Sequence, residues 1–164
     1  MRERGGGAID GGERGSHDGA RTTMHDEARG DPIHDLIAEL GVRVEYSVDL
    51  PPGRLGVYLD DERRILIRAG LSAPLERETL HHEYVHARYR DRSSTPRAER
   101  RAERKSAVML VDERAYAEAE RSGLSPLGIA RQLDLPLAVI AVYQREILAG
   151  RIPDPRLRDL TDTS

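Results

Sequence analysis

The first regular pattern in the chain begins after residue 31 and has a helical period. Apolar side chains recur three or four positions apart from Ile33 to Leu40, which predicts a short helix that starts at Asp31-Pro32. Gly41 closes this helix, and from Val42 to Val48 apolar and polar residues alternate strictly, as in a half-buried strand. The change of period therefore predicts a helix followed directly by a strand.

Two more apolar runs predict a hairpin. The first alternates at Leu55, Val57 and Leu59, residues 60–62 supply a turn, and residues 65–67 are apolar again. Strands joined by so short a turn pair in antiparallel fashion. Together with the strand before them, they predict a small antiparallel sheet.

Helical signals fill the rest of the chain. Pro74 suits a first helical turn, and residues 75–90 contain no helix breaker. Four further helices are predicted, with start signals at Thr95-Pro96, at Asp112, at Ser125-Pro126 and after residues 134–136, the last of them ending before Gly150. This order predicts an α+β fold, in which the small antiparallel sheet packs on the helix over 75–90 and a C-terminal helical bundle follows.

The length of 164 residues suits one compact domain with a core of its own. Residues 1–31 hold eight of the fifteen glycines and almost no large apolar side chains, so they bury too little surface to offset the entropy cost of ordering. We therefore expect a disordered tail at 1–31, a folded domain at 32–152 and a flexible tail at 153–164. Met24 is an alternative to Met1 as the start of the protein.

Composition excludes several classes of protein. The chain has no cysteine, so disulfides are excluded and a zinc site has to use histidine and carboxylate ligands. A net charge of −3 gives no overall attraction to nucleic acid, and no apolar run reaches membrane-spanning length or resembles a signal peptide. We expect a cytoplasmic protein that has neither nucleic acid nor a membrane as its partner.

The segment His82-Glu83-Tyr84-Val85-His86 is the strongest chemical signal in the chain. On a helix, residues four apart share one face, so His82 and His86 can bind the same metal ion. Glu83 then stands beside the open coordination position, where a general base is needed. The H-E-x-x-H pattern therefore predicts a catalytic zinc site on the helix over 75–90.

Zinc needs a third protein ligand, and the sequence offers two carboxylates for it. A third histidine at the usual spacing is absent, because Tyr89 and Arg92 occupy the glycine and histidine positions of the longer motif. Glu99 and Glu103 lie four apart on the next predicted helix, so both can point to one place. Either can be the ligand, while the other orients a zinc-bound imidazole. His81 points about 100° away around its helix and is not expected to bind the metal.

These motifs resemble the ImmA/IrrE-type metallo-endopeptidases, small zincins of bacteria and their phages. The likeness covers roughly residues 32–149: the strands near Gly56 and Ile65, the H-E-x-x-H helix, and the segment that begins at Glu99. That segment is similar to the family's pattern of Glu, two residues, Ala and a polar residue, followed by another Ala and an apolar run. The resemblance implies that Glu99 is the third zinc ligand, as in gluzincins, with Glu103 as the polar residue behind it.

The resemblance also implies an activity. We expect a zinc-dependent endopeptidase in which Glu83 takes a proton from the attacking water and passes it to the leaving amine. The expected substrate is another protein, such as a transcriptional repressor or other regulator of a phage or mobile element. The alternative is a non-catalytic regulator with a structural or vestigial zinc site, whose C-terminal helices contact DNA or a partner protein.

Three other features have an open role. A second group that stabilises the oxyanion is often needed, and the tyrosines suited to it are Tyr58, Tyr84, Tyr89, Tyr116 and Tyr143. The basic stretch from Arg88 to Lys105 is expected to be a solvated face, because acidic residues interrupt it. The last two helices have the spacing of a helix-turn-helix, but the second is mostly apolar and carries Arg145 as its one cation, which indicates a packing element.

Overall fold

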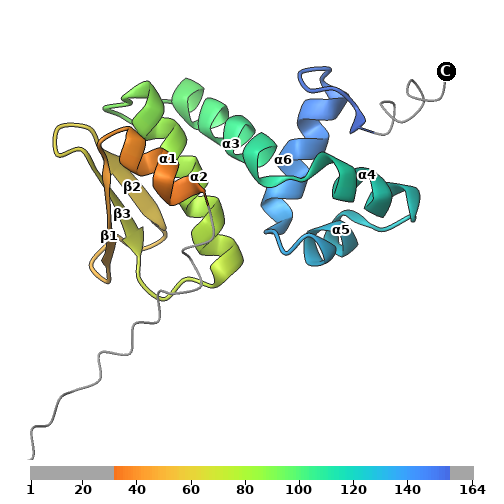
Figure 1. Cartoon of the computed structure of the whole chain (residues 1–164), viewed down its shortest axis with the longest axis horizontal. Helices are drawn as coiled ribbons and strands as arrows, with labels where there is room; N and C mark the ends of the chain where they lie inside the picture. The colour runs from red at the N-terminus through yellow and green to blue at the C-terminus, as the bar shows by residue number, and fades with distance from the viewer. Residues whose placement is uncertain (1–31, 156–164) are drawn as a thin grey trace, which may run out of the picture. The chain divides into compact units, whose positions relative to one another are not determined.

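The computed structural model describes residues 32–155 of the chain. Its elements are α1 (Ile33–Glu39), β1 (Arg43–Ser47), β2 (Gly56–Leu59), β3 (Arg64–Arg68), α2 (Ala73–Tyr89), α3 (Pro96–Leu110), α4 (Glu113–Arg121), α5 (Pro126–Gln132) and α6 (Leu137–Leu148) (Figure 1). The expected tail at 1–31, both possible start residues and the expected C-terminal tail after residue 155 lie outside the described residues. The predicted helices and strands are confirmed close to their expected bounds.

The three strands form one mixed sheet in the order β1-β3-β2. Strands β2 and β3 are the predicted antiparallel hairpin, with Tyr58 opposite Ile65. Strand β1 pairs with β3 in parallel, with Val44 beside Ile65. The predicted α+β class is confirmed, but the expectation of a wholly antiparallel sheet was wrong for β1. Strand β3 therefore lies between β1 and β2 in the sheet, although it follows both of them in the chain.

The first core lies between the sheet and helices α1 and α2, which cover the same face of the sheet (Figure 1). Ile65 and Ile67 of the central strand are fully buried there, as is Ile33 of α1. Side chains of this size contribute roughly 1.5–3 kcal/mol each when they leave water. The apolar face of α2 is therefore fixed against the sheet. This packing also fixes the direction of the helix face that carries the histidines.

A second core lies among the end of α3 and helices α4 to α6. Tyr116 and Tyr143 meet there edge to face, with ring centres 4.9 Å apart, and Ile140 is fully buried beside them. Helix α3 belongs to both cores, because Ala102 packs in the first and Ala107 in the second. Alanines let neighbouring helices approach closely, so α3 connects the sheet-bearing part to the helical part.

The starts of three helices are stabilised by the predicted caps at Thr95, Asp112 and Ser125. Each side-chain oxygen accepts a hydrogen bond from a backbone N–H two or three residues later, at 2.8–3.2 Å. Such a cap contributes about 1 kcal/mol and marks where the helix begins. The cap at Asp112 therefore marks the start of α4 directly after the end of α3 at Leu110.

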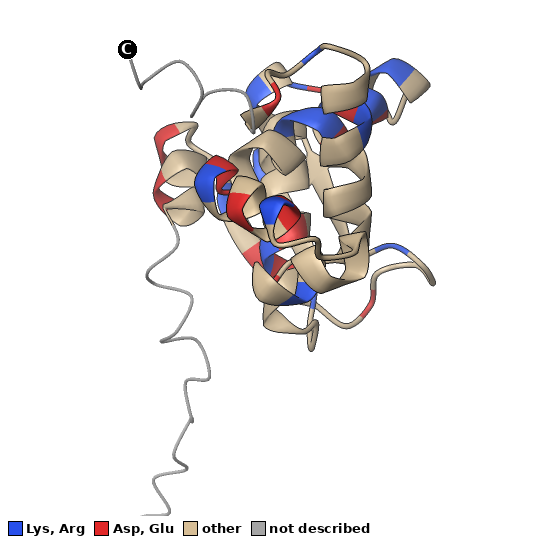
Figure 2. Cartoon of the chain, turned by 90° about the vertical axis from the view of Figure 1, so that its right-hand side faces the viewer, with Lys and Arg blue, Asp and Glu red and all other residues tan. Residues whose placement is uncertain are grey.

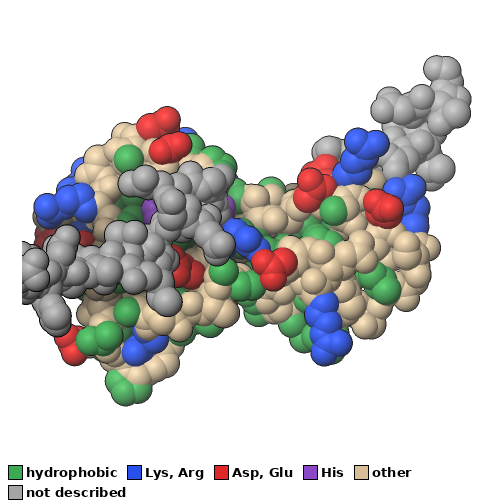
Figure 3. All heavy atoms as spheres, turned by 60° about the horizontal axis from the view of Figure 1, so that its bottom comes forward, with side chains coloured by type: hydrophobic (Ala, Val, Ile, Leu, Met, Phe, Trp, Pro, Cys, Tyr) green, Lys and Arg blue, Asp and Glu red, His purple; other side chains and the backbone are tan. Residues whose placement is uncertain are grey.

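The surface of the described helices carries charges of both signs, interspersed rather than separated (Figure 2). Hydrophobic side chains also reach the surface, in several separate groups on the face that Figure 3 presents. Among the described residues no single helix has both the length and the apolar composition needed to cross a bilayer. Helices α5 and α6 reach that length only when taken together, and the chain bends by 118° between them.

Candidate metal centre

Helix α2 and the first turn of α3 bring two histidines and a glutamate together. His82 and His86 lie one turn apart on α2, and their Nε2 atoms are 3.1 Å apart. The chain leaves α2 through Arg90 in a left-handed conformation and returns through a short loop to α3, where Glu99 lies. One Glu99 oxygen is 3.2 Å from His82 Nε2, and the other is 3.5 Å from His86 Nε2. The three expected ligands therefore meet in one place.

The separations of these atoms fit a tetrahedral metal site. Zinc bonds of about 2.0–2.1 Å at tetrahedral angles require ligand atoms about 3.3–3.4 Å apart. The two histidine Nε2 atoms are 3.1 Å apart, and the distances of 3.2 and 3.5 Å are to the two different oxygens of Glu99. With one ligand atom taken from each residue, the three atoms lie within 4.8 Å of one another. Three protein ligands leave the fourth position to water or substrate, as in catalytic zinc sites. The geometry can thus hold a metal ion with an open position.

The protonation states of His82 and Glu99 also suit a metal. Burial and the neighbouring His86 lower the pKa of His82, so its imidazole is neutral at pH 7. Burial acts against ionised Glu99, but a hydrogen bond from Ser94 and the two histidines keep its pKa below the ordinary value. Neutral imidazoles and an ionised carboxylate are the forms that bind metal ions.

Asp91, which no sequence pattern marks, orients one of the histidines. Its carboxylate lies 2.9 Å from His86 Nδ1 and can only accept there, so Nδ1 carries a proton and Nε2 is the nitrogen left to bind a metal. Burial acts against the charged form of Asp91, but hydrogen bonds from Arg101 and His86 keep its pKa below the ordinary value. The one sequence signal is an acidic residue shortly after the helix, which is too common to indicate a role.

Buried Asp60 holds the loop that carries Asp91. It accepts hydrogen bonds from Arg90 and Arg92, on either side of Asp91, and from the hydroxyl of Tyr58. The hydrogen bond from Arg90, with those from Tyr58 and Arg92, lowers the pKa of Asp60 to about 2. The end of strand β2 is therefore tied to the loop between α2 and α3, which fixes Asp91 next to His86.

Glu83 is buried beside the three candidate ligands, with 7 % of its surface exposed. Its carboxylate meets strand β2, where it accepts a hydrogen bond from the backbone N–H of Tyr58. Burial raises the pKa of Glu83 to about 7, although His86 and Arg54 favour the ionised form. Gly56 permits this close approach, because a Cβ there would lie 2.9 Å from Glu83 Cγ. A carboxyl group with a pKa near neutrality can both take and return a proton.

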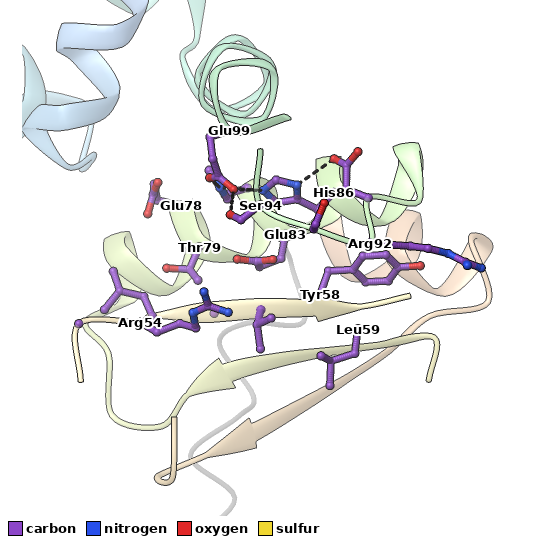
Figure 4. A pocket seen from close by; sticks show the side chains of 17 residues that line it. Arg54, Tyr58, Leu59, Glu78, Thr79, Glu83, His86, Arg92, Ser94 and Glu99 are labelled. Atoms are coloured by element: carbon purple, nitrogen blue, oxygen red, sulfur yellow. Dashed lines mark hydrogen bonds and ion pairs between the residues drawn. The ribbon is translucent and has the colours of Figure 1, made fainter. Parts of the chain in front are cut away.

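An open cavity of about 560 Å³ lies over these residues (Figure 4), and we call it the metal-side cavity. Its walls are strand β2 with residues 53–55 before it, the face of α2 that carries Glu83, and the loop 91–94. Strand β2 is at the edge of the sheet, and no strand of the described residues pairs with its outer side. The cavity therefore runs along a free strand edge, which can accept an extended peptide.

Most of the tyrosines considered for the oxyanion lie elsewhere. Tyr84 and Tyr89 line a different cavity, and Tyr116 and Tyr143 pack in the second core. Tyr58 does line the metal-side cavity, but its hydroxyl donates to an Asp60 oxygen at 2.7 Å and accepts from Arg63 at 3.1 Å. None of the five hydroxyls is therefore in a position to stabilise an oxyanion beside Glu83.

Arg54 stands before strand β2, on a turn that the sheet holds in place. Arg68 donates to the carbonyl oxygens of Leu50, Pro51 and Arg54, at 2.8, 2.6 and 2.9 Å. From this turn the Arg54 side chain extends into the metal-side cavity (Figure 4), where its charge favours the ionised form of Glu83. A cation in the cavity is thus available near the general base.

Glu103 and His81 lie outside the cluster of ligands. One oxygen of Glu103 accepts a hydrogen bond from Arg145 of α6 at 3.3 Å. His81 is buried, with Nδ1 2.8 Å from the carbonyl oxygen of Arg77. Of the two glutamates that the sequence left open, the structure brings Glu99 to the histidines.

Helix α6 exposes few groups that could bind DNA. The exposed residues of this helix are Leu137, Ala138, Ala141, Arg145 and Leu148. Arg145 already lies 3.3 Å from a carboxylate oxygen of Glu103 and 3.4 Å from one of Glu146. A mostly apolar face with a single, paired cation agrees with the packing role expected for this helix.

Comparisons with protein-family models, with curated proteins and with solved structures found no match to this chain. Its function is therefore inferred from the residues of the metal centre and their geometry. The arrangement combines three candidate ligands, a buried carboxyl group next to them and a cavity beside a strand edge.

Proposed function

We propose that this protein is a zinc-dependent metallo-endopeptidase of the ImmA/IrrE type, which hydrolyses peptide bonds of a protein substrate. The observation that carries the proposal is the meeting of His82, His86 and Glu99, with ligand atoms within 4.8 Å of one another, beside buried Glu83. The buried carboxyl group with a raised pKa beside these ligands supports the proposal, because perturbed pKa values concentrate at functional sites.

The chemistry follows from the roles of these groups. A bound zinc ion would polarise the scissile carbonyl and lower the pKa of a water molecule. Glu83 accepts a proton from the attacking water as the new C–O bond forms, and delivers it to the amine nitrogen as the C–N bond breaks. Without a metal its pKa is about 7, and a zinc ion beside it would lower this pKa and favour the ionised form, which is the form that accepts the proton.

The substrate is proposed to bind as an added strand along β2. An extended peptide can form backbone hydrogen bonds with the outer edge of this strand, which runs past Glu83. The Tyr58 backbone N–H already reaches that side, where it donates to Glu83. A cavity open along its length favours an internal segment of a protein over a small molecule.

Arg54 is proposed as the group that stabilises the oxyanion. Its guanidinium extends into the metal-side cavity and acts on the charge of Glu83 (Figure 4). A preorganised cation at the developing oxyanion lowers the barrier, because the negative charge appears only in the transition state. The proposed substrate remains a repressor or other regulator of a phage or mobile element, cleaved in the cytoplasm.

Replacement of Glu83 with glutamine tests the proposal. Protein purified without a metal-affinity tag is analysed for metal content, and cleavage is measured on β-casein and a pool of quenched fluorescent peptides. The wild type is expected to hold one zinc ion per chain and to cleave. Glu83→Gln is expected to keep the zinc and lose cleavage by a factor of about 1,000 or more, because proton transfer is removed.

Two further variants serve as controls for this experiment. His86→Ala is expected to lose both zinc and cleavage. Glu118→Gln makes the same chemical change on the exposed side of α4 and is expected to retain both. Zinc-free wild type, or cleavage by Glu83→Gln at the wild-type rate, refutes the proposal and favours a non-catalytic regulator.

A further inference from the structure

A second cavity, of about 380 Å³, lies between α2 and α3 and uses none of the candidate ligands. We call it the cationic cavity, because Arg88, Arg104 and Lys105 surround it and no acidic residue is among its described lining residues. Its wall is apolar at Val108 and Met109, which are 43 % and 40 % exposed.

The cations of this cavity are largely without acidic partners. Arg151, which also lines it, is held by Glu146 at 2.5 and 3.0 Å. In contrast, no carboxylate of residues 32–155 forms an ion pair with Arg88, Arg104 or Lys105. Cations in a concave, partly apolar surface keep a strong positive potential, because less water screens them. The cationic cavity is therefore complementary to a negatively charged group.

Nucleic acid does not fit this surface well. Tyr89 is the exposed aromatic residue of the wall, and the guanidinium of Arg101 already lies 4.0 Å from its ring centre. Lys105 Nζ lies 5.7 Å from the same centre. The ring therefore makes cation–π contacts within the protein instead of stacking on a base. The phosphate groups of a nucleic acid also have no apolar surface that could pack on Val108 and Met109. A peptide that carries acidic side chains on both sides of an apolar one can pair with the cations and also cover the apolar residues of the wall.

We propose that the cationic cavity is a docking site for an acidic segment of a partner protein. In this interaction the carboxylates of the segment pair with Arg88, Arg104 and Lys105, and an apolar side chain packs on Val108 and Met109. The docking site and the metal centre share helix α2, but docking needs neither zinc nor catalysis. The proposal can therefore fail or succeed independently of the proposed peptidase activity.

Fluorescence anisotropy with a labelled peptide tests the docking site. The probe is a peptide of Glu and Asp residues with interspersed Leu, compared with a version in which Leu is replaced by Ser and with single-stranded DNA of equal charge. The Leu-containing acidic peptide is expected to bind at least about 10-fold more tightly than either comparison ligand. The double variant Arg104→Glu/Lys105→Glu is expected to weaken this binding about 10-fold or more.

A matched variant separates the site from general electrostatics. Arg97→Glu/Arg100→Glu makes the same change of charge on exposed positions of α3 that do not line the cavity, and binding is expected to stay within about 3-fold. Met109→Ser is expected to reduce the preference for the Leu-containing peptide. Absence of binding, equal loss in the two charge variants, or equal binding of the DNA overturns the proposal.

Discussion

Replacement of Gly56 with alanine tests the close packing of strand β2 on helix α2. A Cβ at this position would lie 2.6 Å from Thr79 Cγ2 and 2.9 Å from Glu83 Cγ. Carbon atoms pack best at about 3.5 Å or more, so Thr79 has to retreat by about 0.9 Å and Glu83 by about 0.6 Å. Overpacking of this kind lowers the free energy of unfolding by about 1–3 kcal/mol. Urea denaturation followed by circular dichroism measures the loss.

The same substitution displaces the proposed general base but none of the candidate metal ligands. Zinc affinity, measured by competition with a chelator, is therefore expected to stay close to that of the wild type. Cleavage is expected to fall about 10- to 100-fold, because a misplacement of about 1 Å costs about 100-fold in rate and Glu83 moves by about 0.6 Å. Slower cleavage with unchanged zinc affinity indicates displacement of Glu83. Loss of both indicates general damage to the fold.

A compensating substitution identifies the contact responsible. Thr79→Ser removes Cγ2 but keeps the hydroxyl, which donates to the carbonyl oxygen of Leu75 at 2.7 Å. In the double variant with Gly56→Ala, stability is expected to recover by at least about 0.5 kcal/mol relative to additivity. If Gly56→Ala alone has a free energy of unfolding within about 0.5 kcal/mol of the wild type, β2 and α2 are further apart than the structure places them.

Four other changes test separate parts of the structure. Asp91→Ala removes the acceptor from His86 Nδ1, and a chelator assay should find zinc affinity about 10- to 100-fold lower; unchanged affinity rules out an orienting role. Arg54→Met should lower kcat about 10- to 100-fold with KM within a few-fold, and an unaltered kcat rejects the oxyanion role. Asp60 has a folded-state pKa of about 2, below its ordinary value of 3.8, so its stabilisation is complete above about pH 4 and is lost as the pH falls through 2. Asp60→Asn should therefore lower the Tm at pH 7 and approach the wild-type Tm near pH 2, whereas an equal difference at both pH values would contradict this titration. Ile140→Ala should cost about 2–5 kcal/mol in urea unfolding, because Ile140 is fully buried, while Leu148→Ala, at a position 87 % exposed, should cost less than about 0.5 kcal/mol.

Helix positions were predictable because their signals act within a few residues. The caps at Thr95, Asp112 and Ser125 bond to backbone groups two or three positions later, so each is readable from a short window of sequence. The i, i+4 spacing of His82 and His86 acts within one helical turn in the same way. The distance of 3.1 Å between their Nε2 atoms depends also on the side-chain rotamers, and Asp91 fixes that of His86 from outside the helix.

The pairing of strand β1 was not predictable from its pattern. Alternation of apolar and polar residues indicates which side chains face the core, and it does so for a parallel and an antiparallel strand alike. The neighbour of β1 is β3, which is later in the chain, so its pairing depends on where β2 lies. The hairpin was predictable, because its two strands are joined by a short local turn.

By itself, the sequence determined the succession of helices and strands, the α+β class and the shared helical face of His82, Glu83 and His86, because local hydrogen bonds and periodicity decide these. Spacing alone left Glu99 and Glu103 equivalent, since one helical turn separates them, and the resemblance of the segment favoured Glu99. Tertiary structure alone turned Glu99 to the histidines and brought Arg145 of α6 to Glu103. Contacts between elements far apart in the chain decide such choices, and no local pattern in the sequence encodes them.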